Sequence, residues 1–125
     1  MPIKLWLHII LSTLHIISDR DYQYKNWVLC SDKNIQTSYI EIMCNLFDEG
    51  DVKNFIDNYA REAGLTYLQI IELKKISDAI DQYDGSKLSH EDLLKDPQWI
   101  KITDMAKAAL KILPKDETYG WQAGL

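Results

Sequence analysis

The fold class is decided by residues 65–85, which read LTYLQIIELKKISDAIDQYDG. Thr66 and Gln69 have the spacing of a capping box, in which side chains and backbone at a helix start satisfy each other's hydrogen bonds. Leu65 and Ile70 have the spacing of the hydrophobic staple that accompanies such a start. The stretch therefore predicts an α-helix from Thr66 to about residue 83. Its apolar residues and its stop are Ile71, Leu73, Ile76, Ile80 and Gly85.

The segment before this helix is delimited in a similar way. Asp51 precedes an apolar run and is predicted to be its N-cap. Gly64 suits the left-handed backbone position that closes many helices. We therefore expect a helix between these two residues. Its apolar face consists of Val52, Phe55, Ile56, Tyr59, Ala60 and Ala63.

Two helices are predicted after residue 85. Ser89 and Asp92 repeat the N-cap arrangement and indicate a short helix to about residue 95. Asp96 caps again, and Pro97 takes the first helical position, where a proline is favoured. The last helix ends at Pro114. Its apolar face consists of Trp99, Ile102, Ala106, Ala109 and Leu113.

The N-terminal part is predicted to begin with a helix over residues 2–18. The apolar run 5–17 is shorter than the about 20 residues that a membrane span needs. The sequence SDRD at 18–21 follows it, rather than a small-residue cleavage site, so a signal peptide is not indicated. We expect a largely buried helix in a cytoplasmic protein. One polar stripe runs along it, formed by Lys4, His8, Ser12, His15 and Asp19.

The next two segments are predicted with different patterns. Residues 36–48 carry helical apolar spacing and predict a second helix. Residues 19–33 are less regular and suggest a partly extended connector whose segment 27–30 packs inward, with a further helix as the alternative. Cys30 and Cys44 both lie in apolar runs, and we expect them to be buried free thiols rather than a disulfide.

These elements predict an all-α fold, an irregular bundle of five to six helices with short connections. At 125 residues the chain is expected to form one domain, residues 1–125, with a core that needs no disulfide or metal. Residues 115–125 have no helical period and form a tail, either flexible or docked through its aromatic residues.

Charge is the feature that points to a class of function. Twelve acidic and six basic residues lie between positions 48 and 96, a net charge of −6, against −5 for the whole chain. Such acidity disfavours direct binding to nucleic acid and suits a basic protein partner. Solubility alone is the simpler explanation of a modest negative charge.

Catalytic and metal-binding patterns are weak. His8, His15 and Asp19 share a helix face, but a spacing of seven between the histidines is not the usual spacing of metal ligands. A calcium loop aligned on Gly85 fails because Ile80 would take its first ligand position. No phosphate-binding glycine loop and no catalytic triad are indicated. We expect no cofactor, no metal and no enzymatic activity.

Two acidic groups are the candidate partner-binding residues. Asp48, Glu49 and Asp51 cluster in a turn between two helices. The others lie near the C-terminus of the helix over 66–83, where acids oppose the helix dipole. Residues that break a local rule are candidates for function. This second group is Asp78, Asp81 and Asp84, with Tyr83 among them as a possible interface hot spot.

Part of the chain resembles a known class of proteins. Residues 38–49 (SYIEIMCNLFDE), the preceding WVL at 27–29, and the segment from DPQWI at 96–100 to Leu113 resemble the helical immunity proteins of bacterial polymorphic toxin systems. The nearest group is the immunity proteins of contact-dependent growth inhibition. The resemblance covers roughly residues 25–113 and rests on structural motifs. It leaves the N-terminal helix and the tail unmatched.

The resemblance implies a cytoplasmic protein that binds a cognate toxin domain stoichiometrically and blocks it. We expect a nuclease toxin, an RNase in particular, because carboxylates on an inhibitor replace phosphates in a basic cleft. The alternative is a non-enzymatic helical adaptor or regulatory subunit with a basic partner. Tyr22, Tyr24 and Trp27 are alternative anchors for either partner. The sequence leaves open the toxin's identity, whether its active site is plugged, and the oligomeric state.

Overall fold

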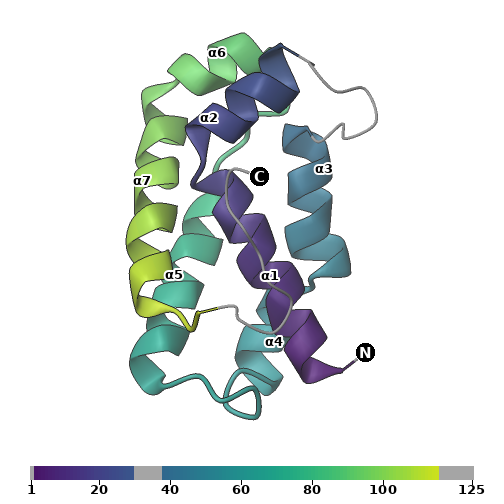
Figure 1. Cartoon of the computed structure of the whole chain (residues 1–125), viewed down its shortest axis with the longest axis vertical. Coiled ribbons are helices and arrows are strands. Elements are labelled where there is room, and N and C mark those ends of the chain that lie inside the picture. Colours follow the sequence, from purple (N-terminus) through teal and green to yellow (C-terminus); the bar gives the residue numbers. More distant parts are fainter. Residues whose placement is uncertain (1, 30–37, 116–125) are drawn as a thin grey trace.

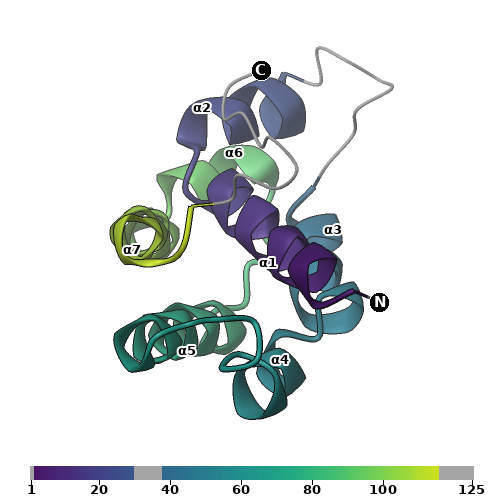
Figure 2. The same ribbon diagram turned by 60° about the horizontal axis from the view of Figure 1, so that its bottom comes forward.

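A computed structural model describes residues 2–29 and 38–115. In this part of the chain every regular element is helical, which confirms the all-α prediction. The long helices α5 and α7 pack side by side, and α1 crosses between them and α3 (Figures 1 and 2). The elements are α1 (Ile3–Ile17), α2 (Arg20–Gln23), the π-helix η1 (Tyr24–Val28), α3 (Tyr39–Cys44), the π-helix η2 (Asn45–Glu49), α4 (Val52–Asn58), α5 (Tyr67–Gln82), α6 (His90–Lys95) and α7 (Pro97–Ile112).

The core is centred on α1. This helix packs against α7 on one side and against η2 on the other. Trp99 of α7 is fully buried and lies among the rings of Trp27, Tyr39 and Tyr83, with centroid distances of 6.3, 5.5 and 5.6 Å. The upper end of the bundle in Figure 1 is therefore held by an aromatic cluster. The buried apolar residues of α1 and α5 are Ile10, Leu11, Leu14, Ile17, Leu73, Ile76 and Ile80.

Three predicted helix starts are confirmed at atomic level. Thr66 Oγ1 accepts from the N–H of Gln69 at 3.2 Å, and Gln69 Oε1 accepts from the N–H of Thr66 at 2.9 Å. Ser89 Oγ accepts from the N–H of Asp92 at 3.1 Å. The Asp96 carboxylate accepts from the N–H of Gln98, and Pro97 occupies the first turn of α7. These starts form because local side chains satisfy backbone N–H groups that a helix leaves without partners.

The prediction of an extended connector after residue 18 is wrong, and the helical alternative is right. Asp19 Oδ1 accepts from the N–H of Tyr22 at 2.9 Å and starts α2, which continues directly into η1. Trp27 faces the core as expected, but Leu29 is 56% exposed. The buried side chain that fixes this helix is Gln23, described below.

The helix that follows Asp51 is shorter than predicted. α4 ends at Asn58, and residues 59–64 continue as turns in which Ala60 is still buried. Asp51 is the N-cap residue, but its φ is 39°, and its side chain does not cap the helix. Gly64 has φ of 95°, the left-handed conformation that was expected there.

Cys44 is exposed, which contradicts the prediction of a buried thiol. Ile42 and Leu46, four residues apart, occupy the buried face of this helix. A residue two positions after Ile42 points to the opposite side, because each residue advances by about 100°. Partial desolvation and the nearby carboxylates, chiefly that of Asp48, raise the pKa of the Cys44 thiol. Cys30, the start of the predicted helix at 36 and the tail residues 116–125 lie outside the described residues.

Among the described residues, no helix combines the length and the apolar character of a segment that crosses a membrane.

Candidate protein-binding surface

The exposed side of α5 is the centre of the candidate surface. This helix packs against α4 and α7 and exposes Asp78 and Asp81. Asp84 follows the end of the helix and is also exposed. Three of the predicted site residues therefore lie where a partner can reach them.

The acidic turn predicted at Asp48, Glu49 and Asp51 is partly helical: Asp48 and Glu49 are the last residues of η2, and only Gly50 and Asp51 form the turn to α4. All three acids are exposed. The indole N–H of Trp6 donates to the carbonyl of Gly50, which ties the turn to α1. Gly50 leaves no room for a side chain, because an added Cβ would lie 2.6 Å from the carbonyl oxygen of Asn45. The Asp51 carboxylate accepts from Asn54 Nδ2 at 3.2 Å. The end of η2 and this turn present the three acids on a fixed backbone.

A lysine joins α4 to the acidic side of α5. Lys53 Nζ lies 2.6 Å from Asp81 Oδ2, and it lies 5.9 Å from the ring centroid of Phe47. The hydrogen bond and charge of Asp81, with a further contribution from Asp78, raise the pKa of Lys53. Asp81 was predicted to be a partner-binding acid, and in the structure its charge is partly compensated by Lys53.

A hollow of about 190 Å³ lies beside this ion pair, between α4 and α5. It has both acidic and basic walls, so the acidic surface is interrupted by lysines at this point. The lining residues are Lys53, Ile56, Asp57, Lys74, Ser77 and Asp78.

A larger groove of about 520 Å³ lies on the other side of α5, against α7. Ile102 and Met105 supply apolar surface, and Asp84 and Lys101 are charged residues that line it. Polar groups make up more of the lining than apolar ones, so the groove suits a partner side chain that forms hydrogen bonds. The other lining residues are Ala79, Gln82, Tyr83 and Gln98.

Tyr83 is a wall of this groove rather than a protruding anchor. It is half-buried against Trp99, and its hydroxyl donates to Asp96 Oδ2 at 2.6 Å. Burial, followed by this hydrogen bond to a carboxylate, raises the pKa of Tyr83. In the structure Tyr83 therefore links the end of α5 to the start of α7 through this hydrogen bond.

Asp84 is not destabilised by the dipole of α5, although its position in the sequence suggested that it would be. It lies beyond the last residue of α5, Gln82. Its Oδ1 accepts from the N–H of Ser86 at 3.0 Å and from the Ser86 hydroxyl at 2.6 Å, and these bonds lower the pKa of Asp84. Asp78 and Asp81 remain in the last turns of α5, where the dipole opposes them.

The structure thus divides the predicted residues into neighbouring parts. Asp78 and Asp81 face the junction of α4 with α5, and Tyr83 and Asp84 border the groove of α5 with α7. Asp48 and Glu49 end η2, and Asp51 lies in the turn before α4. Sequence reasoning missed Lys53 and Lys101. Their exposed positions on amphipathic helices gave a signal that they are on the surface, but none that they lie beside these acids.

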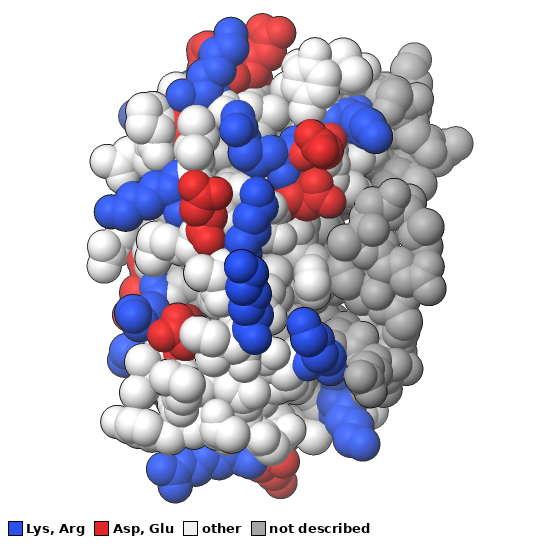
Figure 3. Space-filling model, turned by 60° about the vertical axis from the view of Figure 1, so that its left-hand side comes forward, with Lys and Arg blue, Asp and Glu red and all other residues white. Residues whose placement is uncertain are grey.

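A different charge character marks the outer side of α7. Lys101, Lys107 and Lys111 are exposed there, with Asp104 between them. Figure 3 shows Lys and Arg side chains distributed along this side of the molecule, with acidic groups interspersed. The acidic surface therefore ends at the groove between α5 and α7.

Metal chemistry finds no support in the geometry. Within residues 2–29 and 38–115, no cluster of three or more His, Cys, Asp or Glu side chains is placed to hold a metal ion. His8, His15 and Asp19 are partly buried side chains along α1 and at the start of α2.

Comparison of the chain with protein-family models, with curated protein sequences and with solved structures gives no match.

Proposed function

We propose that this protein is a cytoplasmic immunity protein that binds a cognate toxin domain and inhibits it stoichiometrically, without chemistry of its own. The observation that carries the proposal is the exposed acidic side of α5, which has a hollow on each side and a rigid acidic turn beside it. The resemblance of residues 25–113 to helical immunity proteins supports the same conclusion.

A nuclease domain, an RNase in particular, is the toxin that suits this surface. Its substrate cleft must be basic, because it binds a polyanion. Carboxylates such as those of Asp78 and Asp48 are exposed and would bind the basic residues of that cleft in place of the substrate's phosphates. Attraction between oppositely charged surfaces also accelerates association, and the association rate falls as ionic strength rises.

The proposal is tested by co-expression with the toxin domain encoded beside this gene, followed by co-purification and calorimetry. A 1:1 complex of nanomolar or tighter affinity with rescue of growth is expected. The double variants Asp48→Lys/Glu49→Lys and Asp78→Lys/Asp81→Lys should each slow association by more than tenfold at low salt. Asp104→Lys, a single charge reversal on α7 compared with the two in each double variant, is the control and should have little effect.

The outcomes separate the proposals. Unchanged affinity in both double variants would refute the acidic surface while leaving inhibition of the toxin in place. Absence of both binding and rescue would refute the immunity function and favour an adaptor or regulatory subunit, whose basic partner would then be sought directly.

A further inference from the structure

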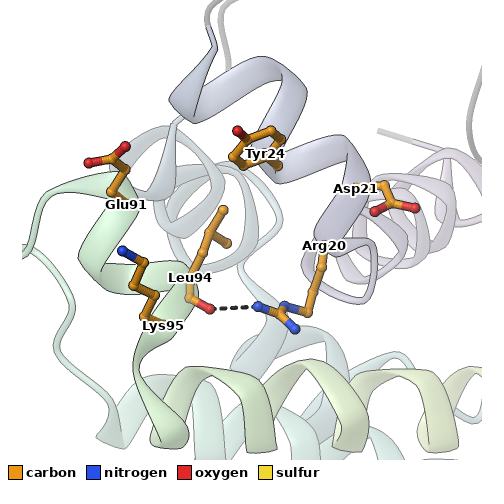
Figure 4. Close-up of a pocket in the computed structure, with 6 residues that line it drawn as sticks. All are labelled: Arg20, Asp21, Tyr24, Glu91, Leu94 and Lys95. Carbon is orange, nitrogen blue, oxygen red and sulfur yellow. Dashed lines mark hydrogen bonds between the residues drawn. The ribbon is translucent and has the colours of Figure 1, made fainter.

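A hollow of about 490 Å³ lies between α6 and the continuous segment formed by α2 and η1 (Figure 4). Its volume falls within the about 300–1,000 Å³ that small-molecule sites occupy. It does not include any of the acidic residues assigned above to the toxin. The lining residues are Arg20, Asp21, Tyr24, Glu91, Leu94 and Lys95.

Arg20 is held in a fixed position in this hollow. One Nη atom donates to the carbonyl of Leu94 at 2.7 Å, in the last turn of α6, where helix carbonyls lack intrahelical partners. This bond uses one of the five N–H donors of a guanidinium. Among the described residues, the Arg20 guanidinium forms no other hydrogen bond and no ion pair, so its remaining donors can serve a ligand.

Lys95 supplies a second cation. It lines the same hollow, and within the described part of the chain it forms no ion pair with Glu91 or Asp21. Figure 4 shows the Arg20 and Lys95 side chains on either side of Leu94, while the Glu91 carboxylate points away from Arg20. The two cations therefore lack a carboxylate partner at this edge of the hollow.

An apolar surface adjoins these cations. The Leu94 side chain is 7% exposed and points toward the ring of Tyr24, which is 49% exposed (Figure 4). A half-exposed aromatic ring over a buried leucine offers apolar contact on two sides. The lining carries two cations and two carboxylates, so its net charge is zero, and the positive charge is confined to the edge formed by Arg20 and Lys95. Tyr24 and Leu94 supply the apolar surface beside that edge.

We propose that this hollow binds a small amphipathic carboxylic acid. The carboxylate accepts hydrogen bonds from Arg20 and Lys95, and the apolar body lies between Tyr24 and Leu94. Guanidinium groups suit carboxylates because two parallel N–H donors match the two oxygens. The same chemistry is offered by a free organic acid and by the terminal carboxylate of a peptide with an apolar last residue. The site requires no toxin and is independent of the proposed function.

The test is an NMR titration of the full chain with 3-phenylpropanoate. Saturable binding is expected, with the largest shifts at the amides around Arg20, Tyr24 and Leu94. The neutral 3-phenylpropanamide should bind at least about tenfold more weakly, because it lacks the charge-assisted hydrogen bonds. Lys95→Ala and Tyr24→Ala should each weaken binding about five- to tenfold. Lys111→Ala removes a lysine far along α7 and should leave the affinity unchanged.

A second titration uses the tripeptide Gly-Gly-Phe with a free or an amidated C-terminus. Tighter binding of the free-ended tripeptide than of 3-phenylpropanoate identifies a chain end as the ligand, and the reverse identifies a free acid. Non-saturable shifts with both probes, or equal affinity for the acid and its amide, would overturn the proposal. So would unchanged affinity in both Lys95→Ala and Tyr24→Ala, since both side chains are exposed and their removal leaves the fold intact.

Discussion

The indole N–H of Trp99 donates to Oε1 of Gln23 at 2.9 Å, and both side chains are fully buried. The amide of Gln23 also donates to the carbonyls of Ile16 and Ile17 at 2.8 and 2.9 Å. One glutamine therefore satisfies the end of α1, anchors α2 and pairs the largest side chain of α7. A buried polar network in which every member is satisfied specifies one arrangement of the helices around it.

Replacement of this glutamine is expected to be costly. Gln23→Met keeps a similar volume but removes the partner of the Trp99 N–H and the side-chain donor to the Ile17 carbonyl, whereas the Ile16 carbonyl still accepts from the N–H of Asp19 at 3.2 Å. We expect the free energy of unfolding to fall by about 2–4 kcal/mol, because each unsatisfied buried group costs about 1–3 kcal/mol. Urea denaturation followed by tryptophan fluorescence measures the change. Gln98→Met, on the exposed side of α7, is the control. Equal midpoints for the two variants would contradict a structural role for Gln23.

Gly50, before α4, and Gly64, at the end of the turns that follow α4, should respond differently to substitution. At Gly50 a Cβ would collide with the backbone of Asn45 and Leu46, so Gly50→Ala and Gly50→Asn should both destabilise by about 1–3 kcal/mol. At Gly64 there is open space, and the cost comes from its φ of 95°. Asparagine tolerates left-handed conformations better than alanine, so Gly64→Asn should be milder than Gly64→Ala. Thermal unfolding of the four variants tests this; a milder Gly50→Asn than Gly50→Ala would refute the steric argument.

Local chemistry explains why most helix starts were predictable. A cap such as that of Thr66 with Gln69 involves residues three apart, so a short stretch of sequence is enough to predict it. The helix after Asp19 was predicted only as an alternative, although Asp19 caps it locally through the N–H of Tyr22. The bond that joins it to α7 links Gln23 to Trp99, residues 76 positions apart, and no local pattern indicates that bond. Cys44 was misassigned because an apolar neighbourhood in sequence does not say which face of the helix is buried.

The candidate site was predictable in composition but not in electrostatics. Asp78 and Asp81 are exposed, as acids on an amphipathic helix should be. The lysine that compensates Asp81 comes from position 53, on another helix, and no spacing rule connects the two. Tyr83 was correctly placed beside the acids in sequence, while its hydroxyl bond to Asp96 depends on how α5 packs against α7.

The Tyr83–Asp96 hydrogen bond should make stability depend on pH in the alkaline range. The pKa of Tyr83 is raised above its ordinary 10.0 by burial and then by Asp96, so the folded state retains this proton more strongly than the unfolded state. Its contribution is therefore complete below pH 10 and is lost as pH rises beyond it. At pH 7, Tyr83→Phe should cost about 1 kcal/mol, the usual contribution of such a bond.

Urea denaturation of wild type and Tyr83→Phe at pH 7, 9 and 11 checks this dependence. The difference between the two proteins should be constant from pH 7 to 9 and should shrink or reverse at pH 11. The pKa of Tyr39 is also raised, chiefly by burial, and that residue is present in both proteins. Its charge contributes to the raised pKa of Tyr83 and therefore acts in the same direction as Asp96. A difference that grows with pH would contradict the proposed sign.

Lys53 provides a test of whether the acidic surface steers a basic partner. Its ammonium lies 2.6 Å from Asp81, and the two side chains are 58% and 46% exposed. Solvent screening makes such exposed pairs weak, so Lys53→Ala should barely change the midpoint of unfolding. The same substitution removes a positive charge from the acidic surface, and association with a basic toxin domain should therefore become roughly two- to fivefold faster at low salt. Stopped-flow association at 20 and 200 mM salt measures the effect, which should diminish at the higher concentration.

Lys111→Ala makes the same change in net charge on α7 and is the control for this experiment. Equal acceleration by both variants would show that total charge, rather than the surface around Asp81, governs the rate of association.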